Sequence, residues 1–408
     1  MVSKGSRIGM MVAWSAFAVM AAFMVWAFFQ EGTLGMYRWG YRAPVLALCA
    51  LGILPLVVGM VLRHTSMRSL QSQARASGIS ISISAVSLVV GLGIAIYLFS
   101  NAYGAAVATQ PPVLIDPAQG FKLRTGVDGG ASFRVALSSD AHYGRDVSNA
   151  TARSAILRRS QTEYEQGRLD AFFNLGDTVE MGMDASDWKE ALTALNLDAP
   201  SLPFLMLMGN HDGLIGGGSR WRAAFAPGSG KRGIPAGGLS ASSWRMDSGP
   251  VHFIALDLLW GPEGFGTKEK DWLSMQLESI PSDEFIVVLS HCFFYSSGYI
   301  DEGTGKAWYD HEEMIRDVAP LIEGKVDLVV SGHNHYMEWL ETDGSAWAVV
   351  GVLGGIPDPE PSYVSPHSVW FKQGVFGRLI LELLPEGLAC EFQDETGQTL
   401  FQKTVTKH

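Results

Sequence analysis

The stretch "VDLVVSGHNH" occupies Val326 to His335, and joins a short apolar run to two histidines that stand one residue apart. An apolar run followed by glycine is typical of a buried strand that ends in a sharp turn, because glycine adopts backbone conformations closed to other residues. Residues i and i+2 of an extended chain project to the same side. His333 and His335 are therefore predicted to face one cluster just beyond the end of a buried strand.

Four earlier apolar runs end in the same manner, namely "FRVALS", "AFFNLG", "PFLMLMG" and "EFIVVLS". The polar residues that follow these runs are Asp140, His142, Asp177, Asn210, His211, Asp212 and His291. Amphipathic stretches between the runs predict helices over 150–166, 186–195, 268–279 and 311–323. Buried strands separated by helices indicate an α/β layered domain, in which the carboxyl ends of the strands form one rim. The five segments that follow these strands are thus predicted to form one metal-binding site.

The structural alternative is that each motif is ordinary by itself. A lone histidine at a strand end is more often a hydrogen-bonded structural residue, and "GD" or "GNHD" is a common turn. Half of the ten histidines, however, occur in these segments, together with three aspartates and one asparagine in a fixed order. This joint occurrence favours the metal site. The structural interpretation is kept for the remaining histidines, which are His64, His252, His311, His367 and His408.

The ordered blocks "DAH", "GDTVE", "GNHD", "SH" and "GHNH" resemble the calcineurin-like metallophosphoesterase superfamily over roughly 133–352, in its membrane-anchored bacterial form. The resemblance implies a two-sheet β-sandwich flanked by helices, with two divalent metal ions at its rim. It assigns one ion to Asp140, His142, Asp177 and His335. It assigns the other to Asp177, Asn210, His291 and His333, so that Asp177 bridges the two ions.

The same resemblance implies a phosphohydrolase that cleaves a phosphate ester with a hydroxide bridging the two metals, because paired ions acidify water and neutralise phosphate charge. His211 would contact the phosphate or protonate the leaving oxygen, and Asp212 would orient its imidazole. The mixed nitrogen and oxygen ligands suit Mn, Fe or Zn without choosing among them. Glu180 stands where relatives usually have Asp or Asn, at a position that is not a direct ligand. Purple acid phosphatases have a tyrosine ligand at this place and lack the first histidine, and protein Ser/Thr phosphatases usually have an arginine soon after this block, which "GDTVEMG" lacks. The resemblance therefore disfavours both branches.

The first hundred residues have a different character. Three uncharged stretches, near 8–29, 43–62 and 79–99, are each long enough to cross a hydrocarbon core of about 30 Å as a helix. The sequence therefore predicts a three-helix transmembrane region over 1–100, a linker over 101–132 and the metallophosphoesterase domain over 133–408. For the first stretch, a signal peptide is the alternative. Five basic residues against two in the short loops predict a multi-pass protein of the cell membrane with its catalytic domain outside the cytoplasm.

The net charge and the loop residues indicate which binding partners to expect. The net charge of −11 argues against a nucleic-acid surface. Aromatic residues in the loops after the motifs suggest an apolar entry for a lipid phosphate, with ordinary loop packing as the alternative. Three spans exceed what anchoring needs, which suggests a homodimer in the bilayer. The motifs do not separate a monoesterase from a diesterase or a pyrophosphatase. The competing function is a non-catalytic membrane scaffold that retains the fold.

Overall fold

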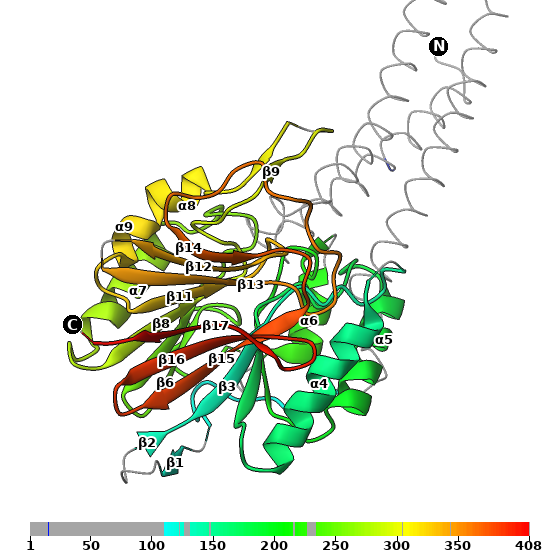
Figure 1. Cartoon of the computed structure of the whole chain (residues 1–408), viewed down its shortest axis with the longest axis horizontal. Coiled ribbons are helices and arrows are strands. Elements are labelled where there is room, and N and C mark those ends of the chain that lie inside the picture. Colours follow the sequence, from blue (N-terminus) through cyan, green and yellow to red (C-terminus); the bar gives the residue numbers. More distant parts are fainter. Residues whose placement is uncertain are drawn as a thin grey trace, which may run out of the picture. The chain divides into compact units, whose positions relative to one another are not determined.

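The computed structural model describes residue 15 and residues 110–408, apart from 122, 126–130, 147, 215–216, 227–233, 304, 343 and 408. Two mixed sheets dominate this part of the chain (Figure 1). The six-stranded sheet has the order β17 (Thr399–Val405), β16 (Gly387–Asp394), β15 (Gly377–Leu384), β3 (Arg134–Ser138), β4 (Ala171–Asn174) and β5 (Phe204–Met206). The seven-stranded sheet has the order β14 (Ser368–Lys372), β12 (Met337–Thr342), β13 (Ser345–Val350), β11 (Leu328–Ser331), β8 (Phe285–Leu289), β7 (Val251–Ala255) and β6 (Trp244–Ser248).

The five apolar runs singled out in the sequence form five of the parallel strands in the two sheets: β3, β4, β5, β8 and β11. β3, β4 and β5 are parallel in one sheet, and β7, β8, β11 and β13 are parallel in the other. Parallel strands are buried on both faces, which explains why these runs are continuously apolar rather than alternating. The parallel strands of each sheet therefore carry their carboxyl ends to a common edge, as predicted.

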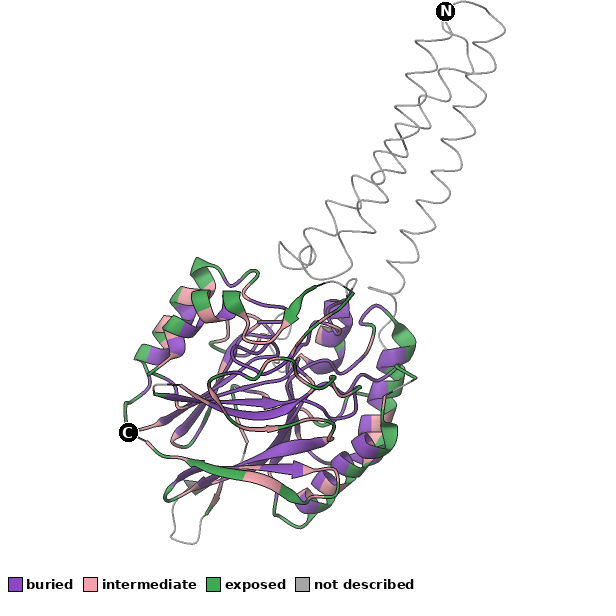
Figure 2. Cartoon of the chain, turned by 45° about the horizontal axis from the view of Figure 1, so that its top comes forward, coloured by how far each residue is buried: buried purple, intermediate pink, exposed green. Residues whose placement is uncertain are grey.

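The main core lies between the two sheets. It includes the fully buried side chains of Phe133, Phe173, Phe253 and Trp339. Phe173 and Phe253 come from opposite sheets, and their ring centroids are 5.3 Å apart. Burial of each such side chain contributes roughly 1.5–3 kcal/mol to stability, so this layer is the principal source of cohesion between the sheets. Figure 2 shows most central strands as buried, whereas exposed residues lie on the outer helix faces, in the loops and on the edge strands β17 and β14.

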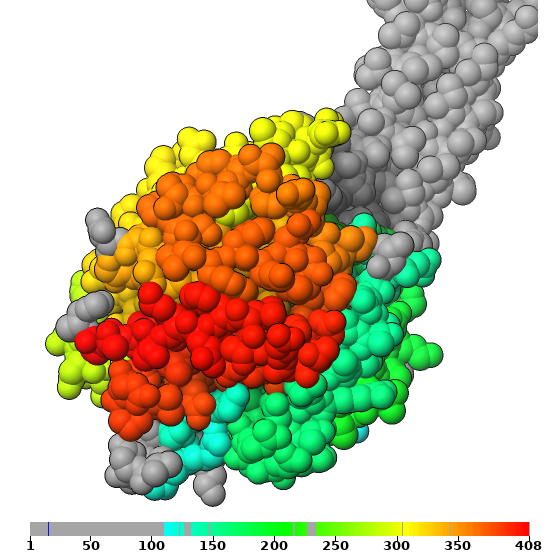
Figure 3. All heavy atoms as spheres, in the orientation of Figure 1, coloured from blue at the N-terminus to red at the C-terminus, as the bar shows by residue number. Residues whose placement is uncertain are grey.

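Helices cover the outer face of each sheet. One group packs on the six-stranded sheet and consists of α4 (Ala150–Glu165), α5 (Ala185–Asp198) and α6 (Gly217–Phe225). The other packs on the seven-stranded sheet and consists of α7 (Thr267–Glu278), α8 (Glu312–Asp317) and α9 (Ala319–Ile322). The predicted α/β domain, two sheets flanked by helices, is thus confirmed. C-terminal residues spread across one face of the domain, beside the segment that contains β14 (Figure 3).

Local chemistry explains where these helices begin and end. Asn149 precedes α4, and its side chain accepts a hydrogen bond of 3.0 Å from the Ala152 amide, which satisfies one of the free donors at the helix start. The helix predicted over 311–323 is instead two short helices, α8 and α9, separated at Val318. Pro320 has no amide hydrogen to continue the α8 ladder, but it fits the first turn of a new helix.

Several elements were not predicted. The hairpin of β9 (Tyr299–Ile300) and β10 (Ala307–Trp308) is too short to show a periodic pattern, and the glycines at the start of α6 hide that helix. β1 (Arg124–Thr125) and β2 (Ala131–Ser132) form a two-stranded sheet within the predicted linker. An earlier part of that linker lies on the sandwich, because the Ile115 amide donates to the Phe204 carbonyl at 2.8 Å.

The membrane prediction needs correction. A spanning helix requires about 20 apolar residues. The longest described helix, α4, has 16 residues and carries several charged side chains, and no helix among the described residues is long and apolar enough to cross a bilayer. Apart from residue 15, the three predicted spans at 8–29, 43–62 and 79–99 lie outside those residues. The three-helix transmembrane region in the predicted fold, and the multi-pass cell-membrane location that followed from it, are therefore withdrawn.

Candidate metal centre

The seven predicted metal ligands meet at the rim formed by the carboxyl ends of the parallel strands. Three groups of residues there place potential ligand atoms within 4.8 Å of one another. The groups are Asp140 with His142 and His335, then His142 with Asp177 and His211, and then Asp177 with His291 and His333. Neighbouring groups share residues, so they form one continuous site rather than three separate ones.

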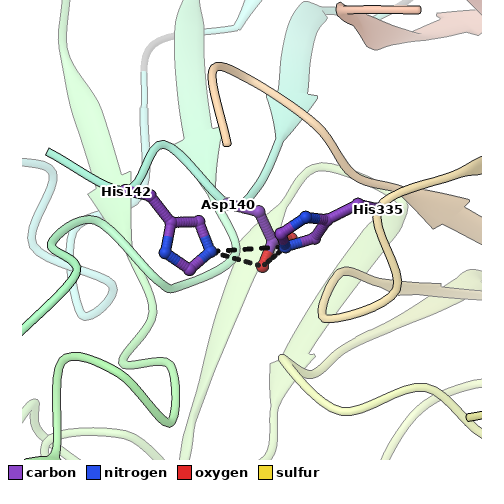
Figure 4. Close-up of side chains that lie close together, drawn as sticks. All are labelled: Asp140, His142 and His335. Atoms are coloured by element: carbon purple, nitrogen blue, oxygen red, sulfur yellow. Dashed lines mark hydrogen bonds and ion pairs between the residues drawn. The ribbon is translucent and has the colours of Figure 1, made fainter. Parts of the chain in front are cut away.

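The first group joins the loop after β3 to the loop after β11 (Figure 4). The Nε2 atom of His335 lies 3.4 Å from Asp140 Oδ1 and 3.3 Å from the Nε2 atom of His142. The same Nε2 atom of His142 lies 3.8 Å from Asp140 Oδ1. Figure 4 shows the three side chains pointing toward one another. Two imidazole nitrogens and a carboxylate oxygen that face a common point are suitable first ligands for a transition metal.

The third group, together with Asn210, lies on the loops after β4, β5, β8 and β11. His291 Nε2 lies 3.4 Å from Asp177 Oδ2 and 2.8 Å from Asn210 Oδ1. The imidazole rings of His291 and His333 have centroids 5.1 Å apart. Asp177 Oδ2 also lies 3.8 Å from His142 Nε2 in the first group. A single carboxylate oxygen therefore lies between the two groups, which is the position that a bridging ligand requires.

The backbone at this rim is unusual. Only five described residues other than glycine have a positive φ angle, and four of them are predicted ligands: Asp140 at 60°, His142 at 46°, Asp177 at 50° and His333 at 70°. Side chains with a Cβ rarely adopt this region, and such strain tends to accumulate at functional sites. The strain here turns each side chain out of the strand direction and into the cluster.

Close backbone packing supports the same geometry. A Cβ atom on Gly209 would lie 2.1 Å from the amide nitrogen of Asp177, far inside contact distance. A Cβ on Gly176 would lie 2.7 Å from the Gly209 backbone. The glycines that the sequence places just before the ligands are therefore required because two strand-end loops touch there.

A second layer of hydrogen bonds fixes the histidine rings. The Nδ1 atom of His142 lies 2.7 Å from the Glu180 carboxylate, that of His291 lies 2.9 Å from the Leu175 carbonyl, and that of His335 is hydrogen-bonded to the Ile356 carbonyl. Each contact engages Nδ1 and leaves Nε2 directed into the cluster, which is the usual arrangement around histidine ligands. The orienting role of Glu180 was not predicted, since the sequence indicated only that Glu180 is not a ligand.

The charges of the cluster favour cations. Burial by itself would raise the pKa of Asp140 and of Asp177, yet the surrounding histidines hold both values below their ordinary range. Burial would lower the pKa of His335 and of His291, but the nearby carboxylates raise these values to about 10 and about 9. Buried carboxylates that hold protons on their histidine neighbours this strongly require positive charge in the same space.

Three buried atoms of the cluster have no hydrogen-bond partner among the described residues: Asp140 Oδ1, Asn210 Nδ2 and His333 Nε2. Leaving a buried polar atom unpaired costs about 1–3 kcal/mol. Asp140 Oδ1 is an electron-pair donor that lies 3.4 Å from His335 Nε2 and 3.8 Å from His142 Nε2, so a divalent cation held by these three residues would satisfy it. The residues present therefore fit a pair of metal ions, and the assignment of each residue to an ion stays a prediction.

The two predicted catalytic residues have different surroundings. His211 is only partly buried, and its ring centroid lies 4.7 Å from that of His142. Its Nδ1 atom lies 2.7 Å from the Glu180 carbonyl oxygen. Within the described part of the chain, Asp212 forms no hydrogen bond with that imidazole. Its buried carboxylate instead accepts hydrogen bonds from the amides of Gly209 at 2.9 Å and Val179 at 3.1 Å, so it braces the loops that carry the ligands.

Comparison with known proteins agrees with this geometry. The family model described as calcineurin-like phosphoesterase matches residues 133–337, which is half of the chain. No curated protein sequence gives a match.

Solved structures resemble the fold at low sequence identity. A purple acid phosphatase from yellow lupin (Lupinus luteus) is 17% identical, with a TM-score of 0.52, over 70% of this chain and 58% of its own. GAP50 of Plasmodium, the anchor in the inner membrane complex, is also 17% identical, with a TM-score of 0.49, over 68% and 89% of the two chains. This chain therefore spans less than two thirds of the lupin enzyme. The likeness to the lupin structure concerns the fold.

Proposed function

Because the chain belongs to the calcineurin-like phosphoesterase family and is thereby a metal-dependent phosphoesterase, we propose that it hydrolyses a phosphate ester at the rim site described above. The observation that carries this proposal is the position of Asp177, whose Oδ2 atom lies between His142 and His291 at 3.8 and 3.4 Å. One carboxylate shared by two ligand groups is the arrangement that a dinuclear centre needs.

The ligands divide between two ions. Asp140, His142 and His335 would hold one ion and Asn210, His291 and His333 the other, with Asp177 shared by both. When bound, such a pair of ions acidifies water and offsets the negative charge of phosphate oxygens. Ca²⁺ and Mg²⁺ prefer oxygen ligands. This histidine-rich set of ligands therefore suits Mn, Fe or Zn better.

His211 would act on the leaving group. The Glu180 carbonyl accepts from Nδ1, so this nitrogen carries a proton in the neutral ring, and Nε2 is the atom that gains or loses one. In its protonated form, His211 would donate from Nε2 to the oxygen that leaves with the alcohol. The His211 amide also donates to Asp177 Oδ1 at 2.8 Å, which ties the position of this acid to the shared carboxylate.

The test is metal-dependent hydrolysis of p-nitrophenyl phosphate by the purified full chain. Chelation should abolish hydrolysis, and addition of Mn²⁺, Fe²⁺ or Zn²⁺ singly should restore it. Asp177→Asn should lower kcat by at least about 100-fold, because the shared carboxylate is lost. The matched control is Asp283→Asn, which changes an exposed aspartate in the turn before β8. Undiminished activity of Asp177→Asn, or a metal content near zero in the active wild type, would refute the proposal.

A further inference from the structure

The β9–β10 hairpin is fastened to the loop that carries the last two histidine ligands. The Asn334 side-chain amide donates to the Trp308 carbonyl at 3.1 Å. Asp358 accepts from the His335 amide at 2.8 Å and from the Tyr299 hydroxyl at 3.3 Å. These bonds connect both strands of the hairpin with the backbone of the metal-binding loop. The hairpin therefore keeps a fixed position beside the site.

The hairpin places a lysine over two aromatic rings at the edge of the site. Lys306 Nζ lies 4.1 Å from the centre of the Trp308 ring and 5.5 Å from that of Trp260. The two rings in turn lie 5.3 and 5.4 Å from the His333 imidazole. A cation over aromatic faces is held there by the ring quadrupole, which restricts an otherwise mobile side chain. Lys306 is exposed, whereas Trp260 is buried.

The geometry sets which part of a substrate Lys306 can meet. The phosphate to be cleaved belongs at the ligands themselves, and one tryptophan ring separates the ammonium from His333. A second anionic group of the substrate, next to the scissile phosphate and on the side of His333, would lie within reach of the lysine. A lysine is a point charge with three donors, which suits a phosphate or carboxylate oxygen without demanding a planar partner.

We propose that Lys306 is a substrate-binding residue that recognises a second anionic group next to the scissile phosphate. The substrate class is then a phosphoanhydride, or a phosphate ester that carries an adjacent anionic group. Trp308 acts as a positioning residue for the Lys306 ammonium. This inference rests on the proposed function, since it takes the rim site as the place of the scissile phosphate.

The experiment measures binding of two probes that differ only in the second anionic group. Methylphosphonate and methylenediphosphonate are titrated by calorimetry into the full chain, with Mn²⁺ kept in excess. In Lys306→Met, the dissociation constant of methylenediphosphonate should rise about tenfold, because one charge-assisted contact is lost. That of methylphosphonate should stay within about twofold. Lys306→Arg should restore most of the difference, and added salt should weaken the wild type more than Lys306→Met.

Two further variants separate recognition from structure. Trp308→Ala should lose affinity for methylenediphosphonate as Lys306→Met does, and Trp308→Phe should keep it. The control Lys325→Met removes an exposed lysine just before β11, at the opposite end of that strand from the site, and should change neither probe. Equal weakening of both probes in Lys306→Met, or no weakening of either, would overturn the inference. Absence of p-nitrophenyl phosphate hydrolysis in a wild type that still shows the Lys306-dependent difference would instead overturn the proposed function.

Discussion

Glu180 contacts the predicted metal ligand His142 from outside the cluster: a carboxylate oxygen of Glu180 lies 2.7 Å from His142 Nδ1. The other nitrogen of the same ring lies 3.8 Å from both Asp140 Oδ1 and Asp177 Oδ2. A carboxylate behind a histidine ligand fixes its tautomer and increases its basicity. Glu180 thus sets which nitrogen of His142 faces the carboxylates of the cluster.

Removing this carboxylate should weaken metal binding without abolishing the fold. Glu180→Ala is expected to raise the metal dissociation constant by about 10- to 100-fold. Glu180→Gln should do less, because its amide oxygen still accepts from Nδ1. Competition against a chromogenic chelator measures both values. The exposed Glu278→Gln on α7 is the control. Metal affinity of Glu180→Ala equal to that of the wild type would show that the contact orients nothing.

The contact between the Gly209 and Asp177 loops predicts a second outcome. In Gly209→Ala, the new methyl group would meet the Asp177 amide at 2.1 Å, and backbone cannot swing aside as a flexible side chain can. The free energy of unfolding should fall by about 1–3 kcal/mol or more, and metal content should fall with it. Urea unfolding and metal analysis of the same sample test this. Gly303→Ala, whose nearest neighbour is a side-chain atom at 3.4 Å, should have neither effect.

The sequence predicted that these side chains lie together because each of them follows a strand with a strong local pattern. His333 stands two residues after β11 and Asp140 two residues after β3. These strands belong to different sheets, so parallel pairing within each sheet and the packing of one sheet on the other together bring the residues to one rim. No local pattern marks Glu180 as the partner of His142 or Ile356 as the partner of His335. Those contacts depend on how loops from separate strands pack. The spacing of residues within one segment does not predict how two loops pack.

The role expected for Asp212 shows the same limit. Adjacency to His211 suggested that its carboxylate orients the imidazole. The turn instead directs Asp212 inward to the Gly209 and Val179 amides. Neighbouring residues in a turn point in different directions, so adjacency in sequence was poor evidence for contact. The hairpin that carries Lys306 was missed for a related reason, since two-residue strands show no periodicity.

Breaking a buried ion pair between α4 and β15 should cost more stability than breaking an exposed ion pair between β12 and β17. Arg378 is almost fully buried, and its guanidinium lies 2.7 Å from Glu163 and 2.6 Å from the Ser160 hydroxyl. In Arg378→Met, an unpaired carboxylate remains in the interior, and the free energy of unfolding should fall by about 3–5 kcal/mol.

The control for this ion pair is Lys403→Met. Its ammonium pairs with Glu341 at the same distance, 2.7 Å, but the two side chains are 41% and 39% exposed. Loss of such a pair should cost under about 1 kcal/mol, because water screens it. Urea unfolding of both variants gives the comparison. The double variant Arg378→Met with Glu163→Gln should recover part of the loss, and equal effects in the two single variants would contradict the assignment of a buried pair.

Asp187 predicts a pH dependence of the free energy of unfolding. Burial, followed by the negative charges of Asp184 and Glu190, raises its pKa to about 6. The ordinary aspartate value is about 3.9, so the folded protein holds this proton more tightly than the unfolded chain does. The stabilising contribution of the protonated Asp187 is therefore complete below about pH 4 and is lost as the pH rises through about 6.

Asp187→Asn carries no titrating proton at this position. The free energy of unfolding of the variant minus that of the wild type should therefore rise between pH 4 and 6 and level off above pH 7. A difference that stays constant across this range in urea titrations would show that Asp187 has an ordinary pKa in the folded protein.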